Sequence, residues 1–193
     1  MKKIPTLFKR FYADHKVIDI VNEVTPGLEW VLNGEGIATI KYDGACCCII
    51  NGNLWRRYDA KKGKTPPEGA IPCCDPDPIT GHWPHWILCN SGNASDKWFI
   101  EAHTNTLREL GYPPVDCTYE AVGPHFQGNP YGLEYDTLIP HGANIILELD
   151  GPRTFDSIRD YLKSHEIEGI VFWKDGEPQC KIKRSDFGFK WPC

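Results

Sequence analysis

The sequence lacks any run of about 18 apolar residues, the length that a membrane-spanning helix needs. It also lacks a net positive charge, because 26 acidic residues outnumber 21 basic ones and give a formal charge of -5. These absences exclude a helical membrane protein and argue against one that coats nucleic acid by bulk electrostatic attraction. The start carries basic residues rather than an apolar leader. We therefore expect a soluble intracellular protein, in the cytoplasm or an equivalent reducing compartment.

The nine cysteines do not form the pattern of a disulfide framework. Their number is odd and three are consecutive, at Cys46 to Cys48, where strand neighbours point to opposite faces. We therefore expect reduced thiols. Zinc-binding residue types do gather in one segment, as Cys73, Cys74, His82, His85 and Cys89. No Cys-x-x-Cys pair occurs there, so buried thiols and packed histidines are favoured over a zinc site.

The predicted secondary structure is mainly antiparallel. Asn51-Gly52 between the apolar runs 45–50 and 54–58 is typical of a hairpin, and Asp175-Gly176 between residues 168–173 and 179–184 predicts a second one. Further strands are expected at 29–32, 117–123 and 144–149, and residues 4–24 include a short helix or strand.

Two helices are predicted. One begins after Ser95 or Asp96 and ends at Leu110 before Gly111, and Thr154 is the expected N-cap of the other. The Pro/Gly-rich residues 61–93 are expected to form a long ordered loop. A length of 193 residues fits one α+β domain built on antiparallel strands.

Lys41 stands between the apolar runs 36–40 and 45–50. Partial burial there would lower the pKa of its amine and make it a nucleophile, although a lysine before Asp-Gly is also an ordinary hairpin residue. Two basic clusters, at 56–64 and 181–184, indicate a phosphate-handling site of limited extent, with solvated surface charge as the alternative.

Charged residues recur in five strand-like segments: Lys41-Tyr42-Asp43-Gly44, Arg56-Arg57, Tyr119-Glu120, Glu168-Gly169-Ile170-Val171 and Lys181-Ile182-Lys183. In this order the set resembles the motifs of the covalent nucleotidyltransferase superfamily of polynucleotide ligases and messenger RNA capping enzymes. The resemblance runs from about residue 22 to residue 192, nearly the whole chain.

Within that superfamily the sequence looks like the ATP-dependent RNA ligases, and most like the group that contains the vertebrate 5'-to-3' RNA ligase. The segments that carry this likeness include 24–27, 34–39, 43–47, 119–124, 128–132 and 183–188. DNA ligases and capping enzymes usually have an arginine five positions after the lysine, where this chain has Cys46.

The resemblance implies an α+β nucleotidyltransferase (adenylation) domain of antiparallel sheets with flanking helices, over residues 1–193, without an appended OB or helical domain. It implies an enzyme that joins 5'-phosphate and 3'-hydroxyl RNA ends through a covalent lysyl-AMP and an adenylylated RNA 5' end. The cofactors would be ATP and Mg²⁺ or Mn²⁺. RNA is the expected partner, with no membrane and no obligate protein partner. The alternatives are a DNA ligase or capping guanylyltransferase core, or a non-catalytic nucleotide- or RNA-binding domain.

The resemblance also assigns roles. Lys41 is the nucleophile, and Lys181 and Lys183 bind the α-phosphate and lower the pKa of Lys41 by like-charge repulsion. Glu120 and Glu168 are the expected metal ligands, and Asp43 positions Lys41 or a metal-bound water.

The remaining nucleotide-binding candidates are less closely defined. One of Arg56 and Arg57 binds the RNA 5'-phosphate or the triphosphate, since strand alternation separates them. Gly44 and the backbone of Ile40 meet the nucleotide, and Glu120 is a candidate for the ribose. The base stacks on Phe126 or Tyr131.

Overall fold

The computed structural model describes residues 3–13 and 16–192, which form two compact units. We call residues 43–141, with Lys3, the central unit, and residues 4–42 with 142–192 the terminal unit. The chain passes from the terminal to the central unit between Tyr42 and Asp43 and returns between His141 and Gly142. The Lys-x-Asp-Gly motif is thus divided between them.

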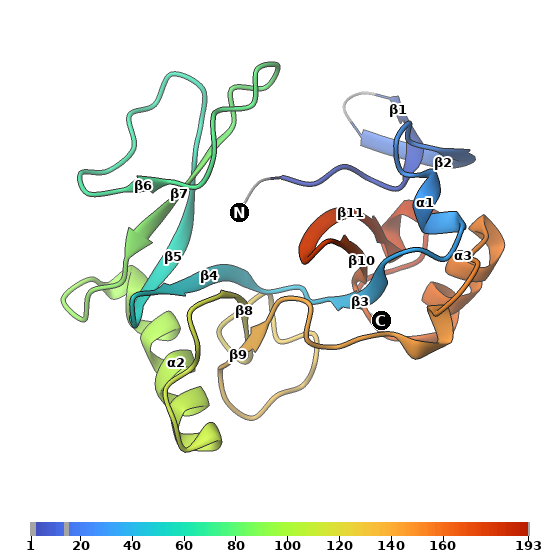
Figure 1. Cartoon of the computed structure of the whole chain (residues 1–193). Coiled ribbons are helices and arrows are strands. Elements are labelled where there is room, and N and C mark those ends of the chain that lie inside the picture. The colour runs from blue at the N-terminus through green and yellow to red at the C-terminus, as the bar shows by residue number, and fades with distance from the viewer. Residues whose placement is uncertain (1–2, 14–15, 193) are drawn as a thin grey trace. The chain divides into compact units, whose positions relative to one another are not determined.

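The central unit is a six-stranded antiparallel sheet with one long helix (Figure 1). Its strands lie in the order β6 (Ile71–Pro72), β7 (Trp83–Leu88), β5 (Asn53–Ala60), β4 (Ala45–Ile50), β8 (Thr118–Val122) and β9 (Thr137–Pro140). Helix α2 (Lys97–Leu110) follows the short turn η1 (Ala94–Asp96) and packs on one sheet face. Cys47, Tyr119 and Leu138 are buried with Ala102 of this helix, so alternate strand residues face the other way.

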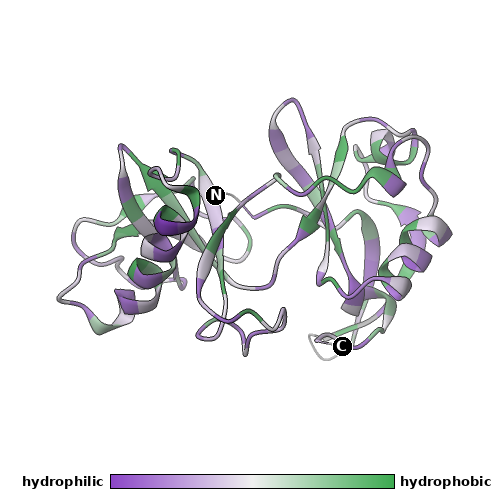
Figure 2. Cartoon of the chain, turned by 90° about the horizontal axis from the view of Figure 1, so that it is seen from below, coloured by the Kyte–Doolittle hydropathy of each residue, from purple (hydrophilic) through white to green (hydrophobic). Residues whose placement is uncertain are grey.

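The terminal unit contains the three-stranded antiparallel sheet β11 (Glu177–Lys183), β10 (Gly169–Lys174) and β3 (Ile37–Lys41). The hairpin of β1 (Phe8–Ala13) and β2 (Lys16–Val24) forms a second sheet. The remaining elements are α1 (Glu29–Leu32), η2 (Leu147–Leu149), α3 (Phe155–Ser164) and η3 (Arg184–Phe187). Ile170, Phe172 and Ile182 are fully buried with Ile158 and Leu162 of α3. Hydrophilic and hydrophobic residues alternate along the helix ribbons in Figure 2, as expected for helices with one buried side.

Much of the predicted secondary structure is confirmed. Strands β4 and β5 pair around Asn51-Gly52, and β10 and β11 pair around Asp175-Gly176. Helix α2 ends at Gly111, which is left-handed (φ 76°), and Thr154 caps α3 by accepting a hydrogen bond from the Ser157 amide. The mixed α and β fold with antiparallel sheets is confirmed, whereas the single domain over residues 1–193 stays a prediction.

Three parts of the prediction are wrong. Residues 29–32 form helix α1 rather than a strand. Residues 144–149 do not form a strand. They lie along the edge of β3, to which two backbone hydrogen bonds join them, and end in η2. The expected loop 61–93 contains β7, whose residues pair with β5 in spite of Pro84, and β9 was not predicted.

The buried side chain of Arg153 explains why an apolar run forms α1. The Arg153 guanidinium is 3% exposed and donates hydrogen bonds to the carbonyls of Val31, Glu35, Gly36 and Leu149 (2.6–3.1 Å). The carbonyls of Val31, Glu35 and Gly36 lie at and just beyond the end of α1, where helical oxygens lack partners within the helix, and that of Leu149 ends η2. A tertiary contact thus stabilises the helical turn, and local sequence gives no sign of it.

No helix within residues 3–13 and 16–192 combines the length and apolar content needed to cross a membrane.

Replacing Arg153 by lysine should destabilise the fold although the charge is kept. A lysine ammonium lacks the planar fork that reaches four carbonyls, and each buried acceptor left unpaired costs roughly 1–3 kcal/mol. Urea unfolding of Arg153→Lys measures the loss. Arg159→Lys, on the exposed side of α3, is the matched control and should stay within about 0.5 kcal/mol of wild type. Equal stability of the two variants would contradict this role for Arg153.

Candidate functional site

The strand register of the terminal unit brings Lys41, Glu168 and Lys183 together. Gly169 begins the middle strand β10 and pairs with Lys41 of β3 on one side and Lys183 of β11 on the other. Residues opposite one another point to the same sheet face, so the two lysines flank this position. Glu168 precedes Gly169 and contacts Lys41 with one carboxylate oxygen and Lys183 with the other.

Gly169 permits the close approach of β11 at this point. A Cβ on Gly169 would lie 2.3 Å from the carbonyl oxygen of Ile182, well inside any normal contact. A side chain here would push β11 away and separate the two lysines that Glu168 joins. The Glu-Gly pair in the sequence therefore has a packing reason as well as a chemical one.

Lys181 completes the group, which we call the lysine cluster: Lys41, Glu168, Lys181 and Lys183. Lys181 lies two residues before Lys183 on the same strand face. Burial, with repulsion from Lys41 and Lys183, lowers the pKa of Lys181 to about 8. The opposite face of these strands, with Ile170 and Ile182, is buried in the core. When all four groups are ionised, three ammoniums and one carboxylate leave an excess of positive charge that suits a phosphate.

Glu168 does not fit a resident Mg²⁺ in this arrangement. It is 4% exposed, and both of its oxygens contact ammonium groups, whereas Mg²⁺ requires free oxygen ligands. Four of the predicted site residues therefore lie together: Lys41, Glu168, Lys181 and Lys183. The Glu168 carboxylate binds two of the lysine ammoniums instead of a metal ion.

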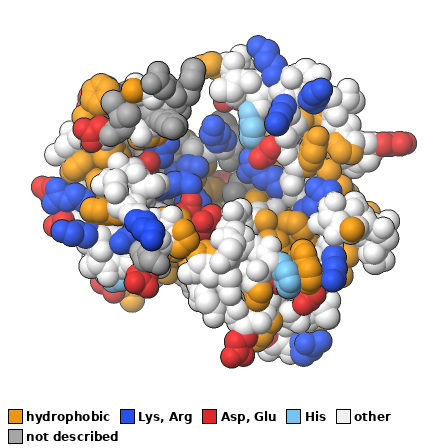
Figure 3. All heavy atoms as spheres, turned by 180° about the vertical axis from the view of Figure 1, so that it is seen from behind, with side chains coloured by type: hydrophobic (Ala, Val, Ile, Leu, Met, Phe, Trp, Pro, Cys, Tyr) orange, Lys and Arg blue, Asp and Glu red, His pale blue; other side chains and the backbone are white. Residues whose placement is uncertain are grey.

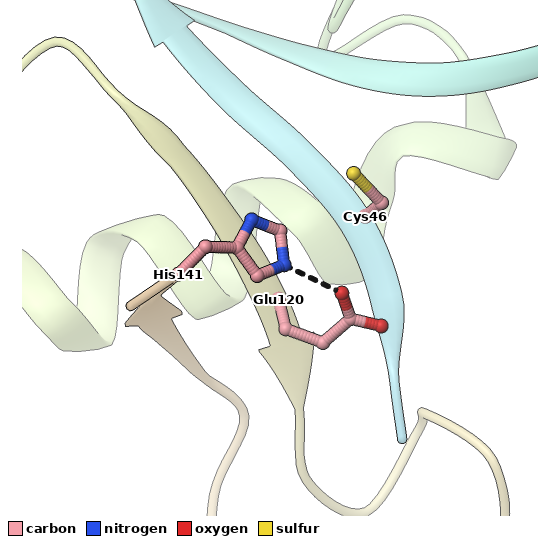
Figure 4. Close-up of side chains that lie close together, drawn as sticks. All are labelled: Cys46, Glu120 and His141. Atoms are coloured by element: carbon pink, nitrogen blue, oxygen red, sulfur yellow. Dashed lines mark hydrogen bonds and ion pairs between the residues drawn. The ribbon is translucent and has the colours of Figure 1, made fainter. Parts of the chain in front are cut away.

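The central unit holds the second half of the motif. The Asp43 amide donates to the Tyr131 hydroxyl (2.6 Å), and the Gly44 amide donates to Glu120 Oε1 (3.1 Å). A Cβ on Gly44 would lie 2.2 Å from the Ala121 carbonyl oxygen, so glycine lets this segment reach β8. Glu120 Oε2 lies 2.9 Å from Nε2 of His141 (Figure 4), a residue that sequence reasoning missed because it follows an unpredicted strand.

Arg56 and Arg57 point to opposite faces of β5, as predicted. Arg56 Nε donates to Asp96 (2.5 Å), which is fully buried and also accepts a hydrogen bond from the Asn90 amide. Asp96 therefore ties α2 to the sheet instead of capping the helix with its side chain. Arg57 lies on the other face, beside Cys46, and pairs with exposed Asp59. The buried ion pair commits Arg56 to the fold and leaves Arg57 as the candidate for phosphate.

Two residues predicted to contact the nucleotide already have partners within the protein. Phe126 is 6% exposed and packs edge-on against Phe99 in the core, so it presents little surface for stacking on a base. The Ile40 amide already donates to the Asn144 carbonyl (2.9 Å). Tyr131, which is half-buried, is the remaining aromatic candidate.

The cysteines within the described part of the chain are free thiols. In the segment considered for zinc, His82 instead pairs with Asp59 (3.2 Å), and His85 Nδ1 lies 2.9 Å from the Trp83 carbonyl. Burial, and to a smaller extent the charge of Glu120, raises the pKa of Cys46 to about 12.

Basic and acidic side chains are interspersed on the face shown in Figure 3, which matches the modest net charge.

Known proteins resemble this chain at low identity. RNA ligase 1 from Pongo abelii is 26% identical over 224 residues, covering 82% of this chain and 69% of that protein. RNA ligase 1 from Mus musculus is 25% identical over 226 residues, with 82% and 68% covered, and that from Danio rerio is 25% identical over 224 residues, with 80% and 68% covered. No protein-family model matches the chain. The chain is thus related to the vertebrate group named RNA ligase 1.

Replacing Lys181 by methionine should raise the free energy of unfolding near neutral pH. The folded protein holds an ammonium whose pKa is about 8, below its ordinary 10.5, so below pH 8 the full cost of burying the charge is present. Between these two pKa values the unfolded state binds more protons, so wild-type stability rises with pH and the advantage of the variant shrinks. Urea unfolding of Lys181→Met and wild type over this pH range measures the difference.

Lys163→Met, on the exposed side of α3, is the control and should show no such pH-dependent gain. A Lys181→Met variant that is less stable than wild type near neutral pH would contradict the conclusion that burying the Lys181 charge costs stability.

Proposed function

We propose that the protein is an ATP-dependent RNA ligase with a nucleotidyltransferase fold, which joins 5'-phosphate and 3'-hydroxyl RNA ends. The lysine cluster carries the proposal, because it supplies a nucleophilic amine, a carboxylate in contact with that amine and two further cations for phosphate oxygens. The relationship to proteins named RNA ligase 1 supports RNA as the substrate.

In the first step the Lys41 Nζ lone pair forms a bond to the α-phosphorus of ATP while the bond to the pyrophosphate oxygen breaks. The ammonium must first lose a proton, and the Glu168 carboxylate in contact with Nζ accepts it. Lys181 and Lys183 neutralise the charge that builds on the α-phosphate oxygens. A divalent cation such as Mg²⁺ or Mn²⁺ would supply further positive charge for the triphosphate oxygens.

In the second step an oxygen of the RNA 5'-phosphate attacks the same phosphorus, the bond between phosphorus and Nζ breaks, and Lys41 leaves as the amine after Glu168 returns a proton to its nitrogen. The RNA then carries AMP through a pyrophosphate linkage. In the third step the 3'-hydroxyl oxygen attacks the RNA 5'-phosphorus and AMP leaves, so a phosphodiester forms. Each step transfers a phosphoryl or nucleotidyl group in line, and the protein contributes alignment and positive charge.

The central unit contains three further residues to which the proposal assigns roles in binding RNA or nucleotide. Arg57 binds the RNA 5'-phosphate or the triphosphate, because Arg56 is held by Asp96. Tyr131 stacks on the base, since Phe126 is in the core. Glu120, which the Gly44 amide holds, is the candidate for the ribose.

Incubation with α-labelled ATP and Mg²⁺ tests the covalent step. The wild-type chain should retain label after denaturation, and Lys41→Ala should retain none, because no amine remains at that position. Lys174→Ala is the matched control, a lysine of the same sheet that pairs with Glu35 outside the lysine cluster. Label that persists in Lys41→Ala, or is lost in the control, would sink the assignment.

Assays with other substrates distinguish the RNA ligase from the alternative functions. α-Labelled GTP that modifies the protein better than ATP would favour a capping guanylyltransferase. Nicked DNA sealed faster than RNA ends would favour a DNA ligase, and nucleotide or RNA binding without a covalent product would favour a non-catalytic domain.

The two arginines should respond differently to alanine. Arg57→Ala should lower ligation by roughly 10²-fold with little change in stability, as expected for loss of one cationic group at a phosphate. Arg56→Ala should instead cost roughly 3–5 kcal/mol of stability, because it leaves Asp96 charged and unpaired in the core. Ligation rates and urea unfolding of both variants measure this contrast. A large stability loss in Arg57→Ala would reverse the assignment.

A further inference from the structure

Cys46, Glu120 and His141 place a thiol, a carboxylate and an imidazole at one point of the central sheet (Figure 4). One sulfur, one carboxylate oxygen and one ring nitrogen all lie within 4.8 Å of one another. The side chains come from three neighbouring segments: β4, β8 and the residue that follows β9. This group has three different donor types, so it is not a simple cluster of surface acids.

The strand register fixes this meeting point. Cys46 of β4 pairs with Glu120 of β8, and Glu120 pairs with Ile139 of β9, two residues before His141. Residues in register, or two positions further, share a sheet face. Their neighbours Cys47, Tyr119 and Leu138 are buried with α2 on the other face. The three donors therefore lie on the face opposite this helix.

Two of the three donors, His141 and Glu120, are also oriented by a contact that their second polar atom makes. His141 Nδ1 lies 2.9 Å from the Thr118 hydroxyl, which leaves Nε2 directed at Glu120. Glu120 Oε1 accepts the hydrogen bond from the Gly44 amide, which leaves Oε2 directed at His141. Such outer contacts are typical of metal ligands, because they fix the ring and the carboxylate before an ion arrives.

We propose that Cys46, Glu120 and His141 bind one Zn²⁺ ion, with a fourth position open to water or to an anionic ligand. Sulfur, nitrogen and oxygen ligands in this combination suit zinc, whereas Mg²⁺ takes oxygen ligands. A thiolate, a carboxylate and a neutral imidazole also balance the charge of the ion. The proposal therefore replaces the expectation that Glu120 binds Mg²⁺.

The required movement is small. Zinc ligand atoms in a tetrahedral site lie about 3.5 Å apart, so separations that are now within 4.8 Å close by roughly 1 Å at most, and the 2.9 Å between His141 Nε2 and Glu120 Oε2 opens by about 0.5 Å. On binding, the Cys46 thiol releases its proton to solvent. The ion takes the position between Nε2 and Glu120, and the single proton of the neutral ring resides on Nδ1, from which it is donated to the Thr118 hydroxyl.

Metal content of the full chain tests the site without an activity assay. After loading with Zn²⁺ and gel filtration in excess Mg²⁺, wild type should retain about one zinc per chain by mass spectrometry. Cys46→Ser and His141→Gln should each lose this equivalent. Cys74→Ser is the matched control, a half-buried thiol from the segment with the alternative zinc-binding residues, and should retain it.

Co²⁺ loading gives a second readout that reports the ligands directly. The wild-type and Cys74→Ser chains should show a thiolate-to-cobalt charge-transfer band, which Cys46→Ser lacks. His141→Gln keeps the thiol, so it decides the case if Cys46→Ser fails to fold by circular dichroism. A wild-type chain without retained zinc, or loss only in Cys74→Ser, would overturn the proposal. None of these results depends on whether Lys41 accepts AMP.

Discussion

Glu168, the residue before Gly169, contacts two lysines that are 142 positions apart in the sequence. It reaches both because strands β3, β10 and β11 pair in one register. Gly169 pairs with Lys41 and with Lys183, and its missing side chain lets β11 approach closely enough for Glu168 to contact both ammoniums. Desolvated cations repel one another, and a carboxylate between them offsets that repulsion. The lysine cluster therefore depends on a backbone contact, and the buried face with Ile170 and Ile182 keeps this contact in place.

The central unit relies on a comparable device. Gly44 approaches the backbone of β8 and donates to Glu120, so a carboxylate is oriented by a main-chain group. Arg56 and Asp96 form the buried pair that ties α2 to the sheet, while the next residue, Arg57, faces the other side. Two adjacent arginines thus lie in different surroundings, one in a buried ion pair beneath α2 and one on the sheet face opposite this helix.

Sequence alone predicted the parts that local chemistry determines. The hairpins around Asn51-Gly52 and Asp175-Gly176 and the end of α2 at Gly111 follow from turn and cap preferences. Helix α1 escaped prediction because Arg153, more than a hundred residues later, satisfies its carbonyls. His141 escaped because β9 gives only a short apolar signal, and the burial of Phe126 depends on Phe99 of a distant helix. The order of the charged motifs was visible in the sequence, but which arginine is buried was not.

The division of the Lys-x-Asp-Gly motif has a consequence for the order in which the chain becomes structured during synthesis. Residues 43–141 leave the ribosome as one continuous stretch and contain every strand of their own sheet. Strand β3 emerges earlier but finds its partner β10 only after that whole stretch has been made. Domains generally fold as units as they emerge, whereas distant pairings form late. A nascent chain that ends before Glu168 therefore carries Lys41 without Glu168 or Lys183, and Lys41 acquires these neighbours only after β10 and β11 have been synthesised.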